Sequence, residues 1–135
     1  MSGDLVLDAS AALEAVLGRT RAIDVLDRIA AATTVRAPDL YASEVANALW
    51  KHIKAGDIDN DRAHQCLRSA LDLIDSIIPS RTLVEEAMVT AAEYDHPVYD
   101  ALYLVAARRT GAAVCTLDRR LAALLKEARV PVDLV

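Results

Sequence analysis

Short apolar runs that alternate with long helical patterns are the feature that most constrains the fold of this chain. Most of the runs lack polar alternation, as do strands that are buried on both faces of a sheet. They cover residues 5–7, 34–37, 76–79, 113–116 and 132–135. Helical patterns fill the segments between them. This order predicts a three-layer α/β/α fold around a central, mostly parallel five-stranded sheet.

Local signals set the expected ends of the helices. Thr20 is a candidate N-cap for the second helix, and Gly56 and Gly111 are typical residues to follow the third and the sixth. The first two expected helices begin near residue 10 and after residue 20, and the next two cover about 39–55 and 60–75. The fifth begins after residue 80 or 82, the sixth follows residues 96–97 and ends at residue 111, and the seventh covers about 119–128.

Length and composition limit the class of protein. The chain has 135 residues, of which 54% are hydrophobic, so we expect one domain over residues 1–135 with a sizeable core. Its net charge of −5 argues against a broad basic face that coats nucleic acid, but not against a cleft that holds metal ions. No signal peptide or membrane span is evident, which predicts a cytoplasmic protein.

Two acids lie just beyond the carboxyl ends of predicted strands, where ligands bind in parallel α/β sheets. Asp8 comes immediately after the run at 5–7, and Asp118 follows the run at 113–116 with one residue between. The carboxyl ends of parallel strands lie at one edge of the sheet, so we expect these two side chains to lie close together. Asp100 opens a helix that is otherwise apolar on nearly every side, and it can face the same edge.

A fourth acid lies on the helix expected at 39–55. Glu44, Asn47 and Lys51 are spaced i, i+3 and i+7 and form one polar stripe on it. Each acid also has an ordinary explanation. Asp8 and Asp118 are good N-cap residues, Asp100 complements a helix dipole, and Glu44 suits an exposed helix position. Three or four clustered carboxylates would instead favour a bound cation, and hard oxygen ligands without Cys or His suit Mg²⁺ or Mn²⁺.

In order, these segments resemble the motifs of the PIN-domain ribonucleases, most of all the VapC toxins of toxin–antitoxin pairs. LVLDASAAL is similar to the first motif, APDLYASEVANALWK to the second, and YDALYLVAARRTGAAVCTLDRRL to the third and fourth. The resemblance implies that the catalytic, metal-binding acids are Asp8, Glu44, Asp100 and Asp118. It also implies that they are supported by Ser10, Asn47 and Thr116.

The resemblance further implies an endoribonuclease that uses Mg²⁺, or Mn²⁺ in its place, to cleave RNA. It implies a homodimer held inactive by a cognate, VapB-like antitoxin. Candidate substrate contacts are Arg119, Arg120 and His96, with solvated surface as the alternative for each. Two other functions stay open: a PIN nuclease that acts on other RNA or on DNA outside a toxin system, and a non-catalytic module that binds nucleic acid or protein.

Overall fold

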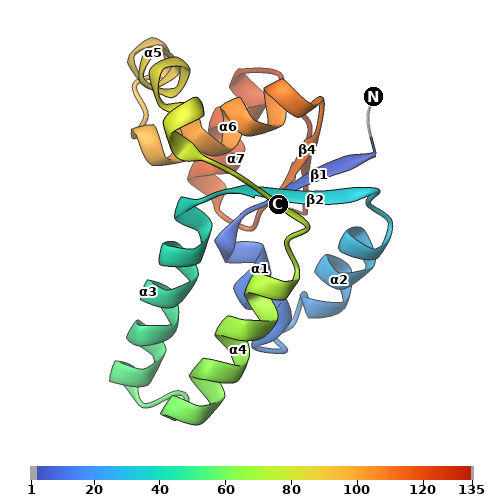
Figure 1. The fold of residues 1–135 in the computed structure, drawn as a ribbon, viewed down its shortest axis with the longest axis vertical. Helices are drawn as coiled ribbons and strands as arrows, with labels where there is room; N and C mark the ends of the chain where they lie inside the picture. Colours follow the sequence, from blue (N-terminus) through green and yellow to red (C-terminus); the bar gives the residue numbers. More distant parts are fainter. Residues whose placement is uncertain (1–2, 135) are drawn as a thin grey trace.

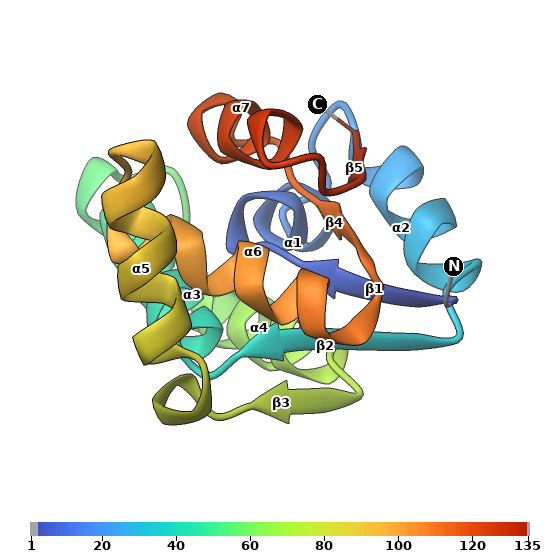
Figure 2. The ribbon, with the colours of Figure 1, turned by 90° about the horizontal axis from the view of Figure 1, so that it is seen from above.

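A parallel five-stranded sheet forms the centre of the molecule. The computed structural model describes residues 3–134. Its strands are β1 (Asp4–Leu7), β2 (Thr34–Pro38), β3 (Ser76–Ile78), β4 (Ala113–Cys115) and β5 (Val132–Asp133). They lie in the order β3-β2-β1-β4-β5, and all neighbouring strands are parallel, as Figure 2 shows from above. The predicted sheet is confirmed, although the last strand ends at Asp133, and Val135 lies outside the described residues.

Helices cover both faces of the sheet and give the predicted three layers. α1 to α4 lie on one face, and α5 to α7 lie on the other (Figure 1). The helices are α1 (Ala9–Val16), α2 (Ala22–Ala30), α3 (Leu40–Ala55), α4 (Asn60–Asp72), α5 (Val84–Tyr94), α6 (Val98–Thr110) and α7 (Arg119–Glu127), with a 3₁₀ turn at Ser80–Thr82 before α5.

Alternation along β1 divides the core between the two faces. Leu5 and Leu7 pack with the helices of the first face, whereas Val6 packs with α6 and α7 on the other. All three side chains are fully buried, because a central strand between two helical layers has no solvated side. This double burial explains why the strand reads as a continuous apolar run.

The helix ends agree with the sequence signals at two of the three positions. Gly56 and Gly111 both adopt left-handed backbone conformations, with φ of 80° and 66°, directly after α3 and α6. The expectation for Thr20 is wrong, because Arg21 is the residue that precedes α2. The turn before α2 is thus one residue longer than expected, and a suitable capping residue alone does not determine where the helix begins.

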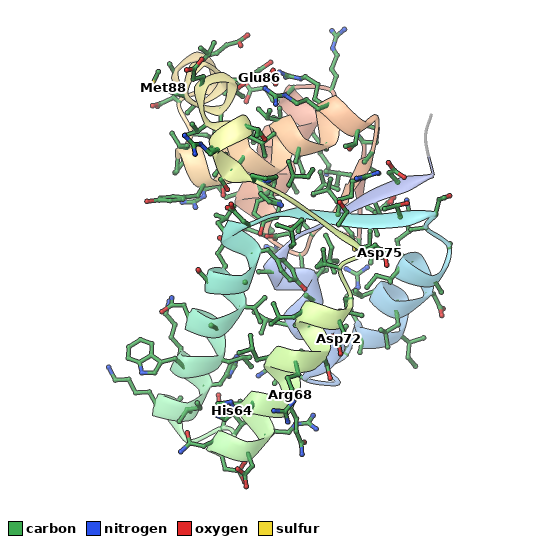
Figure 3. The ribbon with its side chains drawn as sticks, viewed as in Figure 1. His64, Arg68, Asp72, Asp75, Glu86 and Met88 are labelled. Carbon is green, nitrogen blue, oxygen red and sulfur yellow. The ribbon has the colours of Figure 1, made fainter. Side chains whose placement is uncertain are left out.

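The end of α4 also differs from the prediction, since the helix stops at Asp72 and not at Asp75. Figure 3 shows both residues at this end of the helix. The Asp75 side chain accepts a hydrogen bond from the Val35 N–H at 2.8 Å, and the Asp75 N–H donates to the Val35 carbonyl at 2.8 Å. Asp75 thus joins the chain to β2 before β3 begins. Within residues 3–134, no helix has the length and apolar character needed to cross a membrane.

The strand order places the carboxyl ends of β1 and β4 side by side. β1 pairs with β2 on one side and with β4 on the other, so the direction of winding reverses between β1 and β4. Leu7 is in register with Cys115, and the Asp8 N–H donates to the Cys115 carbonyl at 3.0 Å. Such a reversal point is where parallel α/β sheets bind ligands.

Candidate metal-binding and nuclease site

Asp8 lies at the carboxyl end of the central strand β1, where two hydroxyl groups bind its carboxylate. Ser10 Oγ and Thr116 Oγ1 each donate to Asp8 Oδ2 at 2.7 Å. The two donors follow the two paired strands, because Ser10 is in α1, directly after β1, and Thr116 follows β4. Burial raises the pKa of Asp8, the two hydroxyl hydrogen bonds oppose that rise, and the neighbouring Asp118 adds to it. The two hydroxyls therefore support a buried negative charge.

Glu44 connects the two helical layers across the same edge. It lies on α3, and its Oε1 accepts a hydrogen bond of 2.6 Å from the hydroxyl of Tyr103 on α6. The pKa of Glu44 is raised to about 7, mainly by burial; the charges of Asp8, Asp100 and Asp118 add to the rise, and the Tyr103 hydrogen bond opposes it. The other three predicted acids are thus close enough to Glu44 for their charges to affect its pKa.

Asp100 lies in the first turn of α6 and is buried, as its apolar helical neighbours suggested. Its Oδ2 accepts a hydrogen bond from Arg120 Nε at 3.0 Å and lies 3.8 Å from His96 Nδ1. Two of the three predicted substrate contacts therefore lie against a predicted metal ligand. Arg119, the third, is exposed at the start of α7.

Asp118 is the N-cap of α7. Its Oδ1 accepts hydrogen bonds from the backbone N–H groups of Arg120 at 2.9 Å and Leu121 at 3.3 Å. The capping explanation for this acid is therefore observed. It does not exclude a role at the site, since Asp118 also lines the cleft that holds Asp8 and Glu44.

The cleft between α1 and α3 has a volume of about 270 Å³ and is open to solvent on one side. It is lined by Asp8, Ala9, Ser10, Leu13, Glu44, Asn47, Ala48, Lys51 and Asp118. The stripe of Glu44, Asn47 and Lys51 therefore faces the site as a unit. Lys51 supplies a positive charge beside the acids. Its i, i+3, i+7 spacing from Glu44 and Asn47 had indicated that it shares their face of α3.

Tyr103 is the residue whose role at the site was not predicted. Its position on the same helical face as Asp100 was evident, but its bond to Glu44 joins residues 59 apart in sequence. The other two histidines, His52 and His64, do not line the cleft. Figure 3 shows His64 on α4, toward the end of the helix remote from the sheet, and His52 Nδ1 lies 2.9 Å from Asp57 Oδ2.

The donor set fits a hard divalent cation in kind, because it consists of carboxylate oxygens that repel one another. Among residues 3–134, no three Asp, Glu, His or Cys side chains form a ready coordination group. Each carboxylate is instead turned toward a donor of the protein. An ion at this site would therefore share the carboxylates with donors of the protein.

The sequence matches the PIN domain family over residues 5–126. Ribonuclease VapC3 of Pyrobaculum aerophilum is 32% identical over 120 residues, which cover 87% of this chain and 92% of that protein. Ribonuclease VapC1 of Mycobacterium tuberculosis is 31% identical over 121 residues, which cover 89% of this chain and 90% of the relative. Both alignments span nearly the whole length of each protein.

Solved structures share the fold. The crystal structure of PAE2754 from Pyrobaculum aerophilum superposes with a TM-score of 0.75 at 25% identity, over 96% of this chain and 82% of that one. VapC20 of Mycobacterium tuberculosis, a toxin that cleaves the sarcin–ricin loop, superposes with a TM-score of 0.67 at 17% identity, over 88% and 93%. At that identity the likeness concerns the fold alone. By sequence and by fold, the chain belongs to the PIN domain family.

Proposed function

We propose that this chain is a metal-dependent endoribonuclease that hydrolyses RNA phosphodiester bonds as the toxin of a toxin–antitoxin pair. The observation that carries the chemistry is the gathering of Asp8, Glu44 and Asp118 around one cleft at the carboxyl ends of β1 and β4, with Asp100 near enough to raise the pKa of Glu44. Mutually repelling carboxylates at the reversal point of a parallel sheet favour a cation site for phosphate chemistry. Relatives named as ribonucleases, aligned over nearly their full length, support RNA as the substrate.

Asp8, Glu44, Asp100 and Asp118 would hold Mg²⁺, with Mn²⁺ as a substitute. Once bound, such an ion supplies Lewis acidity, which activates water and offsets charge on the phosphate and the leaving oxygen. Ser10 and Thr116 orient the Asp8 carboxylate through their hydroxyl groups. Asn47 lies beside Glu44 in the cleft as a supporting polar group.

Basic side chains around the acids are candidates for contact with RNA phosphates. Lys51 lines the cleft, and Arg120 lies against Asp100. Arg119 is exposed in the same turn of α7, and His96 precedes α6. A few cations around an acidic centre suit one strand of RNA better than a broad duplex surface, because the chain as a whole carries a charge of −5.

We further propose that the chain acts in the cytoplasm as a single domain over residues 1–135, as a homodimer, and that a VapB-like antitoxin restrains it. The relatives named VapC support the antitoxin. The homodimer is proposed from the resemblance of the sequence motifs to the VapC toxins alone. Sedimentation of the purified chain, alone and with the product of a neighbouring short reading frame, tests both assemblies. A chain that stays monomeric and unpartnered would contradict them.

The test of the activity is RNA cleavage. Purified protein is incubated with a pool of transfer and ribosomal RNA in Mg²⁺, in Mn²⁺ and in EDTA, with Asp8→Asn as the matched control. We expect cuts at few positions that require the metal and disappear in the variant. Equal cleavage by the variant would reject the proposed site. Metal-dependent RNA binding without cleavage by the wild type would favour the non-catalytic binding module.

A further inference from the structure

The ion pair between Arg120 and Asp100 joins an exposed cation to a buried acid at the site. Arg120 Nε lies 3.0 Å from Asp100 Oδ2. The Arg120 side chain is 63% exposed, whereas that of Asp100 is only 11% exposed. The Arg120 side chain can therefore turn into solvent with little loss of packing, whereas the Asp100 carboxylate is enclosed by the protein.

The position of Arg120 is fixed by the same site. Its backbone N–H donates to Asp118 Oδ1 at 2.9 Å, so the N-terminal turn of α7 is attached to one predicted metal ligand while its guanidinium binds another. His96 Nδ1 also faces this carboxylate, at the longer distance of 3.8 Å. An arginine stays charged at any physiological pH, so Arg120 is the permanent counter-charge of this carboxylate.

A divalent cation and a guanidinium compete for the negative charge of one carboxylate. Asp100 Oδ2 already accepts the Arg120 hydrogen bond, so an ion bound to this carboxylate would lie near a guanidinium whose charge repels it. Arg120 thus offsets the charge of Asp100 before any ion arrives.

We propose that Arg120 is an internal counter-cation that competes with a divalent ion for Asp100, so that this arginine lowers the metal affinity of the site. The proposal rests on the proposed function, because it takes Asp100 as a metal ligand. Arg120 is here a positioning residue, because it acts on the ion through the Asp100 carboxylate that it binds. The counter-cation therefore raises the concentration of free metal that the site needs in order to fill.

The matched control is the neighbouring arginine. Arg119→Gln removes the same charge from the same turn of α7, and Arg119 is exposed. Both variants weaken long-range repulsion between the protein and a cation, but only Arg120→Gln removes the direct competitor. A partly exposed ion pair has a modest free energy, so we expect Arg120→Gln to bind Mn²⁺ about twofold to fivefold more tightly than Arg119→Gln.

The measurement is calorimetric titration of Mn²⁺ into metal-free wild type, Arg120→Gln, Arg119→Gln and Asp100→Asn. Tighter binding by Arg120→Gln than by both the wild type and Arg119→Gln supports the proposal. Equal affinity of the two arginine variants overturns it, because the effect is then one of net charge. If Asp100→Asn binds Mn²⁺ as the wild type does, Asp100 is not a ligand, and the metal site of the proposed function fails as well. Weak binding by Asp100→Asn with no difference between the arginine variants rejects the counter-cation alone.

Discussion

Glu44 makes the free energy of unfolding depend on pH, and Glu44→Gln should remove that dependence. In the metal-free protein, burial and the three neighbouring acids raise the pKa of Glu44 from 4.5 to about 7. Glutamine has nearly the same shape and cannot ionise. Its amide oxygen can still accept the hydrogen bond that Tyr103 gives to Oε1 at 2.6 Å. The substitution therefore isolates the charge.

The sign follows from proton binding in the two states. Between about pH 4.5 and pH 7 the unfolded chain has released the Glu44 proton and the folded protein retains it, so stability falls as pH rises through this window. The full difference in pKa corresponds to about 3 kcal/mol at most. Solvent screening at a partly exposed side chain reduces the expected effect to about 1–2 kcal/mol. Above pH 7 Glu44→Gln should be more stable than the wild type by this amount.

Urea unfolding in EDTA, at about pH 5 and about pH 8, measures the effect. Glu93→Gln is the control, because Glu93 is an exposed acid on α5 and its substitution removes the same formal charge. We expect the advantage of Glu44→Gln over the wild type to grow with pH, and that of Glu93→Gln to stay within about 0.5 kcal/mol throughout. An advantage of Glu44→Gln that is equal at both pH values would refute the electrostatic account.

Three further predictions concern the other acids and their partners. Asp118→Ala should cost about 1 kcal/mol of stability, because α7 loses its cap, whereas Asp118→Asn should keep the cap. Thermal unfolding distinguishes the two variants, and equal losses of stability would contradict the capping role. Thr116→Val should cost about 1–3 kcal/mol in urea unfolding, because a buried Asp8 carboxylate loses a donor, and an unchanged midpoint would contradict this. Mn²⁺ should raise the melting temperature of the wild type but not of Asp8→Asn; equal shifts would place the ion elsewhere.

Most of the fold was predictable because it follows from which segments can be buried on two faces. The apolar runs at 5–7 and 113–116 become the central β1 and its neighbour β4. Once strands are parallel, their carboxyl ends share one edge, so a residue directly after a strand has a predictable place. Asp8 and Asp118 were located in this way, although only the three-dimensional fold shows that Asp8 lies at the reversal point.

The contacts that set the charge balance were not predictable. Tyr103 with Glu44, and Arg120 with Asp100, are pairs that depend on how α6 is rotated relative to α3 and α7. Sequence spacing fixes which face of one helix a residue occupies, but not which residue of another helix faces it. For the same reason Lys51 could be assigned to a polar stripe, while its place in the cleft followed only from the packing of α1 against α3.

The capping and ligand explanations of Asp118 were rivals in the sequence, but the structure makes them compatible. A cluster of carboxylates is costly unless each charge is offset. The N-terminus of α7 offsets Asp118, two hydroxyl groups offset Asp8, and a guanidinium offsets Asp100. Glu44 receives a single neutral hydroxyl, and its pKa is raised to about 7 by burial and, to a smaller extent, by the other three acids. Burial and Asp118 also raise the pKa of Asp8. At Glu44 and Asp8, therefore, both burial and repulsion oppose the negative charge, and either a proton or a divalent cation would relieve that cost.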